Sequence, residues 1–260
     1  MLPVLMAFVC GLLCGSFLNV CIYRLPRKES VAYPPSHCPA CGRRLQAAEL
    51  VPVVSYLWQR GHCRGCGAVI SPRYLLVEIL TGLVFAALAW RFGWPALLWH
   101  AAFFAVLIVI LFIDLDHMVI PNCLVLLLAV FLPARLLAGE IFFLQAVAGM
   151  LLGGGFFFLL ASLSRGGMGE GDVKLAAMLG LWYGWKLLLP LIFLAFLGGG
   201  AFGVILLALK VKRRKDAIPF GPFLVLAAFL VSMWGKQIIA WYLRTGGFVE
   251  FLSAFLSGQT

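Results

Sequence analysis

The chain has 260 residues, of which 63% are hydrophobic and only 12% charged. An ordinary soluble domain is about 45–50% apolar and about 25% charged. A soluble fold of this size has too little interior for so much apolar surface, so a soluble globular domain is excluded, and a disordered chain with it. The long unbroken apolar runs are also unlike the alternating strands of an outer-membrane barrel. The composition therefore predicts an all-α polytopic membrane protein that crosses the lipid bilayer.

The formal net charge is +10, from 20 Lys and Arg against 10 Asp and Glu. In a soluble protein such an excess would suggest nucleic acid as a partner. Cytoplasmic loops of membrane proteins collect Lys and Arg for a different reason, because these residues fix the orientation of the helices. We therefore expect no nucleic-acid partner.

The first apolar segment covers residues 1–23 and has no basic residue before it, whereas Arg24, Arg27 and Lys28 follow it. A secretory signal has the reverse order, with the basic residues first. The segment is therefore predicted to be an uncleaved transmembrane helix whose N-terminus lies outside the cytoplasm.

Residues 24–73 form the one long polar stretch, which holds eight of the 20 basic residues and two acids. This bias predicts a cytoplasmic loop. The basic residues are Arg24, Arg27, Lys28, Arg43, Arg44, Arg60, Arg64 and Arg73.

The remaining apolar runs, with the first, predict about eight transmembrane helices. The seven further helices are expected at 74–92, 96–113, 120–138, 141–163, 173–185, 187–209 and 221–243. Threading from an outside start places loops 24–73, 114–120, 164–172 and 210–220 in the cytoplasm, and the last of these contains Lys210, Lys212, Arg213, Arg214 and Lys215. We expect three parts: the first helix (1–23), a cytoplasmic loop domain (24–73) and a transmembrane domain (74–260).

Segment 173–185 is the shortest of these helices. At about 1.5 Å per residue it covers roughly 20 Å, less than the roughly 30 Å of a hydrocarbon core. Either the helix continues past Trp185 or its start lies below the membrane surface. Two glycine triplets, at 153–155 and 198–200, are predicted to be positions of close helix packing.

The cytoplasmic loop contains two C-x2-C pairs, Cys38 with Cys41 and Cys63 with Cys66, each followed directly by a glycine. Four thiolates satisfy a tetrahedral zinc ion, with iron as the less common occupant. Two disulfides are the alternative, but a cytoplasmic loop is reducing. Four sulfur ligands leave no open position, so the predicted zinc site is structural and would help fold a domain with little core.

Other residues could be proposed as ligands. His37 and His62 each precede a cysteine of the loop, either as substitute ligands or as solvated side chains. The remaining cysteines lie in apolar segments and are expected to be small buried side chains. They are Cys10, Cys14, Cys21 and Cys123.

Four of the ten acids lie at two predicted cytoplasmic helix ends: Asp114 and Asp116 at one, Glu170 and Asp172 at the other. Two juxtaposed carboxylates have pKa values that are pushed apart, so that one is protonated while the other is ionised. The ionised one can remove a proton from water while the neutral one polarises a carbonyl, which hydrolyses a peptide without a metal.

Other roles for these acids stay open. An interfacial acid can be merely hydrated, and Asp172 stands where a helix begins, a favourable place for an acid. Gly169 and Gly171 would let a substrate backbone approach Asp172. Glu78 lies deeper, in the second helix, as a partner for a polar group or for substrate. Lys174 is either a supporting residue or a positive anchor of the helix.

At these motifs the sequence resembles the bacterial type IV prepilin peptidases, which are GxGD-type intramembrane aspartic proteases. The resemblance covers nearly the whole chain. Its parts are residues 15–26, the paired cysteine knuckles, residues 71–74 with Val77 and Glu78, residues 113–122 and residues 169–175.

The resemblance implies two catalytic aspartates, Asp114 and Asp172. Asp116 is the rival for the first role, but two helical residues are about 200° apart, so both cannot face one partner if the helix continues. We favour Asp114 because the family pattern has its aspartate six residues before the isoleucine of the Ile-Pro pair. Asn122 stands where many members have an aspartate.

The resemblance also implies the activity and its setting. The family cleaves a short basic leader from type IV prepilins and type II secretion pseudopilins after a glycine, at the cytoplasmic face of the bacterial inner membrane. Many members then methylate the new N-terminus with S-adenosylmethionine, for which the sequence shows no donor site. The alternatives are a peptidase without methyltransferase activity and a proton-coupled membrane transporter.

Overall fold

A computed structural model describes residues 1–164, 168–211 and 218–244. The chain divides into two compact units, Met1–Glu140 and Ile141–Thr260. The described residues form helices, with two isolated bridges as the β-structure among them. The basic residues predicted at 212–215 lie outside the described residues.

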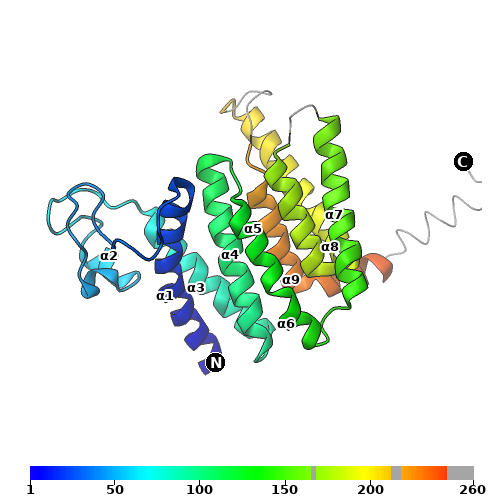
Figure 1. Cartoon of the computed structure of the whole chain (residues 1–260), viewed down its shortest axis with the longest axis horizontal. Helices are drawn as coiled ribbons and strands as arrows, with labels where there is room; N and C mark the ends of the chain where they lie inside the picture. Colours follow the sequence, from blue (N-terminus) through cyan, green and yellow to red (C-terminus); the bar gives the residue numbers. More distant parts are fainter. Residues whose placement is uncertain (165–167, 212–217, 245–260) are drawn as a thin grey trace, which may run out of the picture. The chain divides into compact units, whose positions relative to one another are not determined.

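The first unit (Figure 1, blue to green) contains the N-terminal helices and the long polar loop. Its helices are α1 (Leu2–Arg24), α2 (Val54–Trp58), α3 (Arg73–Arg91), α4 (Ala96–His117), α5 (Asn122–Val130) and α6 (Leu132–Leu137), with short 3-10 turns at Leu25–Arg27 and Ala47–Leu50. The loop begins where α1 ends and returns where α3 begins, so the polar residues gather at this end of the helix pair.

Helices α1 and α3 cross closely because α1 presents glycines to its neighbour. A Cβ at Gly11 would lie 2.8 Å from the Cα of Gly82, and one at Gly15 would lie 2.7 Å from the Cα of Glu78. Glycines spaced four apart are typical of helices that pack in a membrane. This crossing brings the backbone of α1 directly against Glu78.

The second unit contains α7 (Phe143–Leu163), α8 (Glu170–Ala208) and α9 (Gly221–Arg244). Helices α7 and α8 also meet through glycines, because a Cβ at Gly180 would lie 2.1 Å from the carbonyl oxygen of Gly149. The predicted role of the first glycine triplet holds for Gly153, where a Cβ would lie 2.5 Å from the Ala176 carbonyl oxygen. Nothing lies within 4 Å of a Cβ at Gly155.

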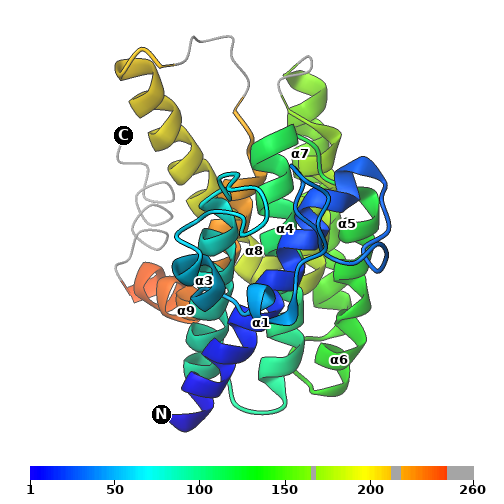
Figure 2. The same ribbon diagram turned by 90° about the vertical axis from the view of Figure 1, so that its left-hand side faces the viewer.

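Helix α8 spans 39 residues but changes direction at Gly184, whose φ of 69° and ψ of 167° are not helical. Figures 1 and 2 show both ends of α8 at the top, so its two halves run in opposite directions. The first half therefore does not continue past Trp185 in the same direction. The two halves correspond to the predicted helices 173–185 and 187–209, and α5 with α6 to the predicted helix 120–138.

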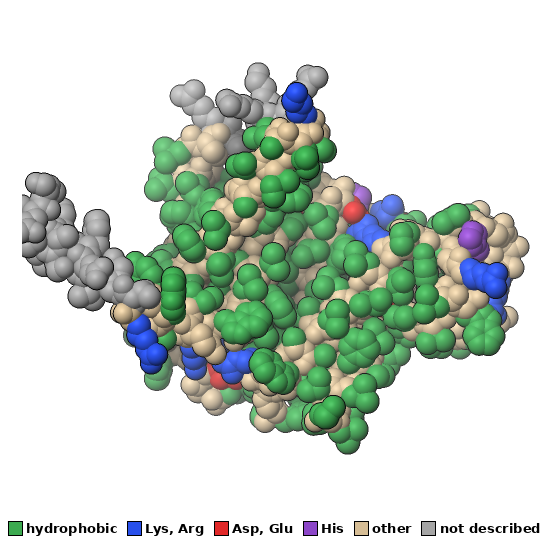
Figure 3. Space-filling view, turned by 180° about the vertical axis from the view of Figure 1, so that it is seen from behind, with side chains coloured by type: hydrophobic (Ala, Val, Ile, Leu, Met, Phe, Trp, Pro, Cys, Tyr) green, Lys and Arg blue, Asp and Glu red, His purple; other side chains and the backbone are tan. Residues whose placement is uncertain are grey.

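Six described helices are long and apolar enough to cross a membrane: α1, α3, α4, α7, α8 and α9. Hydrophobic side chains cover much of the face of the molecule that Figure 3 shows. Large apolar residues of several helices are exposed; Leu83, Leu151 and Phe193, for example, are 55%, 65% and 66% exposed. Water would not tolerate this surface, whereas lipid would. The protein is a multi-pass helical membrane protein, as the composition predicts.

Candidate metal centre and active site

Each cysteine pair in the polar loop forms a small hairpin. In the first, the Cys38 N–H donates to the Arg43 carbonyl and the Gly42 N–H donates to the Cys38 carbonyl, both at 2.9 Å. The second repeats this pattern from Cys63, at 2.9 and 2.8 Å. The glycine after each pair has a φ near +70° (71° and 69°), which only glycine adopts readily. The two segments have the same C-x2-C-G sequence and therefore form the same hairpin.

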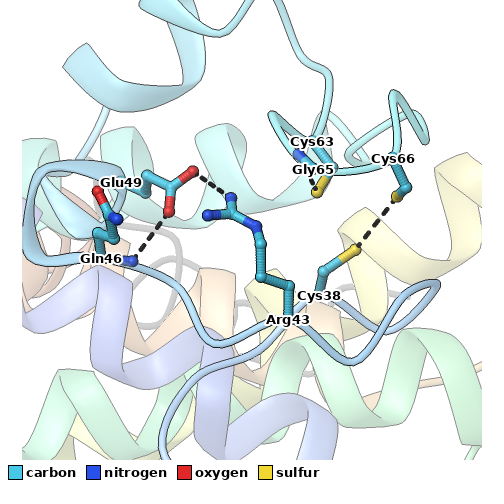
Figure 4. Close-up of polar contacts among 7 residues, drawn as sticks. All are labelled: Cys38, Arg43, Gln46, Glu49, Cys63, Gly65 and Cys66. Carbon is cyan, nitrogen blue, oxygen red and sulfur yellow. Dashed lines mark hydrogen bonds and ion pairs between the residues drawn. The ribbon is translucent and has the colours of Figure 1, made fainter.

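The two knuckles bring the four cysteines together, with their Sγ atoms all within 4.8 Å of one another. The Sγ atoms of Cys38 and Cys66 are 3.9 Å apart (Figure 4). A tetrahedral ion with metal–sulfur bonds of about 2.3 Å separates its sulfurs by about 3.8 Å. The residues present therefore fit a tetrahedral metal ion, as the spacing predicts.

The backbone prepares one of these cysteines for metal. The N–H groups of Cys66 and Gly65 point at the Cys63 sulfur and lower the pKa of the Cys63 thiol to about 6. The Gly65 nitrogen is 3.4 Å from that sulfur. Since the thiolate is the form that binds metal, these amides favour the state that a ligand needs.

The histidines beside the cysteines do not join this cluster. His37 and His62 are exposed, and their Nδ1 atoms lie 3.1 and 2.6 Å from the carbonyl oxygens of Pro35 and Arg60. Among the described residues, the metal-binding group consists of four cysteines. The two histidines are therefore solvated side chains, as one of the two alternatives predicts.

The four cysteines outside the loop were expected to be buried. Cys10, Cys14 and Cys123 are exposed, so that expectation was wrong for them, and of these four only Cys21 is buried.

A half-buried ion pair holds the first knuckle to the following 3-10 turn. The Arg43 Nη2 is 2.6 Å from Glu49 Oε1, and the Gln46 N–H donates to Glu49 Oε2 at 2.9 Å (Figure 4). The Gln46 amide and then the Arg43 guanidinium lower the pKa of Glu49 below its usual value. The Glu49 side chain is only 1% exposed, so this carboxylate needs both partners to stay charged.

The two acids at the end of α4 have different surroundings. Asp114 is buried, with 4% of its surface exposed, whereas Asp116 is exposed. Arg73, the first residue of α3, forms an ion pair with Asp116 and donates from Nη2 to the Phe112 carbonyl at 3.2 Å. Sequence reasoning missed this role of Arg73, since it identified Arg73 only as one of the basic loop residues.

The motif that contains these acids also ends one helix and begins the next. Helix α4 ends at His117, and Met118 then adopts a φ of 52° with its N–H bonded to the Asp114 carbonyl at 2.9 Å. Pro121 cannot donate to a helix, and α5 begins directly after it at Asn122. Asp114 therefore lies in the last turn of α4.

The second predicted aspartate lies in the other unit, in the first turn of α8. Asp172 is 9% exposed, and Gly169 precedes the helix in an extended conformation. Its neighbours differ from it: Glu170 is 93% exposed and pairs with Lys174, the Nζ–Oε2 distance being 3.6 Å. An acid in a first helical turn is favoured by the exposed backbone N–H groups there.

Glu78 is buried in α3, 8% exposed, and accepts the Val53 N–H at Oε2 over 2.8 Å. The polar partners of Glu78 are thus a backbone amide of the four-cysteine loop and the Ser16 side chain of α1. Val53 itself has a φ of 63°, which a β-branched residue rarely adopts.

Two family models match the sequence of this chain. Residues 9–92 match the model of the bacterial peptidase A24 N-terminal domain, and residues 101–204 match that of the type IV leader peptidase family. Relatives named prepilin leader peptidase/N-methyltransferase occur in several bacteria. The relative from Aeromonas hydrophila is 39% identical over 275 residues, covering 92% of this chain and 93% of the relative.

Two further relatives have the same name. The one from Pseudomonas aeruginosa is 37% identical over 281 residues, covering 94% of this chain and 95% of the relative. The one from Bacillus subtilis is 34% identical over 239 residues, covering 91% and 96%. No solved structure matches the chain significantly.

The fold and the motifs together define a multi-pass membrane enzyme with a four-cysteine loop. The chain belongs to the type IV leader peptidase family. The resemblance predicted from the motifs is confirmed, and the family membership disfavours the transporter alternative.

Proposed function

We propose that this enzyme cleaves the leader peptide from type IV prepilins and then methylates the new N-terminal residue. Its relatives match nearly the full length of the chain, and their name contains both activities. The observation that best supports the peptidase chemistry here is the contrast at the end of α4, where Asp114 is buried and Asp116 is paired with Arg73. Asp114 and Asp172 are the proposed catalytic pair.

The proposed cleavage uses the two carboxyl groups in different protonation states. The ionised carboxylate removes a proton from water, and the oxygen of that water bonds to the carbonyl carbon of the leader's last glycine. The protonated carboxyl group donates a hydrogen bond to the carbonyl oxygen. The carbon–nitrogen bond then breaks, and the proton passes to the leaving amine, which becomes the new N-terminus.

Three neighbours of Asp172 have proposed supporting roles. A Cβ at Gly169 would lie 3.6 Å from Asp172 Oδ2, so glycine leaves room beside the carboxylate. Gly171, next to Asp172, is proposed to let a substrate backbone come close. Lys174 is bound to Glu170 at the surface, which suits a residue that orients the helix end rather than one that reacts.

Charge and topology support a proposal for the setting of the reaction. We propose that the protein lies in the bacterial inner membrane, with the four-cysteine loop and both aspartates on the cytoplasmic side. Type II secretion pseudopilins are proposed substrates as well, since their N-termini share the same apolar helix. The proposed parts are the first helix (1–23), the four-cysteine domain (24–73) and the peptidase domain (74–260).

The proposed metal is zinc. Cys38, Cys41, Cys63 and Cys66 would hold it, and four thiolates with no open position suit a structural ion. Zinc would hold the two knuckles together, because the loop of about fifty residues has little apolar core of its own.

The second reaction requires S-adenosylmethionine, which supplies a methyl group on a positively charged sulfur. The deprotonated N-terminal amine bonds to the methyl carbon, and the carbon–sulfur bond breaks with its electron pair remaining on sulfur. The sequence contains no glycine-rich nucleotide fingerprint, so any donor site must be built from other residues.

The test is cleavage of a purified prepilin in detergent, with the product mass recorded with and without S-adenosylmethionine. Wild type should cleave, Asp114→Asn and Asp172→Asn should not, and the donor should add the mass of one methyl group. Full cleavage by either variant would disprove the proposed pair. Cleavage without any mass gain would leave a peptidase alone.

A further inference from the structure

A cavity of about 390 Å³ lies where the four-cysteine loop meets α1 and α3. Its volume is within the range of small-molecule sites. Both the helix pair and the two knuckles form its wall, so it exists only when the loop is folded onto the helices. The lining residues include Asn19, Tyr23, Ser55, Tyr56, Gln59, Tyr74 and Glu78.

A buried carboxylate forms part of the cavity wall. Glu78 is 8% exposed and accepts hydrogen bonds from the Val53 N–H, at Oε2, and from the Ser16 side chain. An ionised carboxylate can accept about four hydrogen bonds, so the Val53 amide and the Ser16 side chain do not saturate it. None of the ion pairs among the described residues involves Glu78. A buried charge without an ionic partner favours a cationic ligand.

The other charged groups of the wall are already bound within the protein. Arg24 donates from Nη1 and Nη2 to the carbonyls of Ser30 and Pro34, at 2.9 and 2.7 Å. Glu49 is paired with Arg43. Glu78 is therefore the charged side chain of the wall that is most able to interact with a ligand.

Aromatic and amide side chains complete the wall. Tyr23, Tyr56 and Tyr74 contribute rings, which stack on flat heterocycles and attract cations through their faces. Asn19 and Gln59 can donate and accept hydrogen bonds, although the Asn19 amide also donates to the Tyr74 carbonyl at 3.0 Å. This mixture suits a ligand with a flat ring, hydroxyl groups and one positive charge.

We propose that this cavity binds the methyl donor S-adenosylmethionine and that the Glu78 carboxylate stabilises its positive charge. The inference rests on the methyl-transfer half of the proposed function. The strained φ of 63° at Val53 is consistent with it, because that conformation directs the Val53 amide at Glu78 and holds the carboxylate in place.

The charge makes a specific prediction about affinity. S-adenosylmethionine and the analogue sinefungin carry a positive charge at the reacting centre, whereas S-adenosylhomocysteine is neutral there. Wild type should therefore bind the first two about tenfold more tightly than the third, a difference of about 1.4 kcal/mol. Glu78→Gln keeps the size of the side chain and should bring that ratio close to one.

Binding is measured by isothermal titration calorimetry on the full-length protein in detergent, with all three compounds. Glu29→Gln is the matched control, because Glu29 is an exposed acid of the same loop that does not line the cavity. Ser55→Phe tests the cavity by filling it without a change of charge, and should weaken all three compounds. Val54→Phe is its control, since Val54 is 57% exposed and not part of the wall.

The bound metal per chain is measured for every variant to confirm that the loop is folded. An unchanged affinity ratio in Glu78→Gln with unchanged binding in Ser55→Phe would disprove the donor site and leave the proposed function intact. Wild type that cleaves prepilin but binds neither charged compound would disprove both the donor site and the methyltransferase half of that function.

Discussion

Arg73 at the start of α3 forms an ion pair with Asp116 in the last turn of α4, and this contact distinguishes the two aspartates of that turn. Asp114 is buried on another side of the same helix. Residues two apart on a helix differ by about 200° in direction, which accounts for their different surroundings. Asp116 is thus paired with the Arg73 guanidinium at the surface, whereas Asp114 is buried.

We predict that Asp116→Asn retains cleavage of prepilin within about threefold, whereas Asp114→Asn loses about 10²–10⁴-fold in kcat/KM. Arg73 and Asp116 are 30% and 35% exposed, and an ion pair of this kind stabilises a protein by about 0–1 kcal/mol. Steady-state cleavage in detergent measures the change in kcat/KM, and thermal unfolding measures the contribution of the ion pair to stability. Equal losses of activity in the two variants would assign a catalytic role to both acids.

At the start of α8 we predict that Asp172→Asn abolishes cleavage to a similar extent, while Glu170→Gln leaves it nearly unchanged. Glu170 is 93% exposed, so its charge is well screened, whereas Asp172 is buried. A complication is that Asp172 also stabilises the helix start. The melting temperature of Asp172→Asn is therefore recorded, and a large loss of stability with residual activity would favour a structural role.

The knuckles could be predicted from sequence because the ligand spacing and the following glycine act within a few residues. The separate surroundings of Asp114 and Asp116 follow from helix geometry and could also be anticipated. The Arg73 contact could not, because Arg73 and Asp116 are 43 residues apart and meet only through the packing of α3 on α4. The cavity beside Glu78 could not be predicted either, since it depends on how the loop folds against α1 and α3.

Loss of one cysteine should release the metal. We predict that Cys38→Ser lowers the bound metal per chain at least tenfold, because a hydroxyl is a much weaker ligand for zinc than a thiolate. Cys123→Ser, which changes an exposed cysteine of α5, should bind as much metal as wild type. Metal is quantified by mass spectrometry of the purified protein. Full metal content in Cys38→Ser would contradict a four-cysteine site.

The Arg43–Glu49 pair should make the stability of the loop depend on pH. The pKa of Glu49 is lowered below its usual value of 4.5, so the charged pair stabilises the fold above that pH. As pH falls through the lowered pKa, Glu49 is protonated and this contribution disappears. We predict that Glu49→Gln melts at a lower temperature than wild type at pH 7, and that the difference shrinks below about pH 4.5. A constant difference across this pH range would show that shape rather than charge is responsible.

The glycine contact between α7 and α8 gives a prediction that is independent of the chemistry. A Cβ at Gly180 would lie 2.1 Å from the Gly149 carbonyl oxygen, so Gly180→Ala must push the two helices apart. We expect it to lower the free energy of unfolding by about 1–3 kcal/mol, as overpacking usually does. Gly155→Ala is the matched control, because nothing lies within 4 Å of its Cβ and alanine favours a helix by about 0.5–1 kcal/mol. Thermal unfolding in detergent should therefore move in opposite directions for the two variants, and a shared direction would contradict the close packing of α7 on α8.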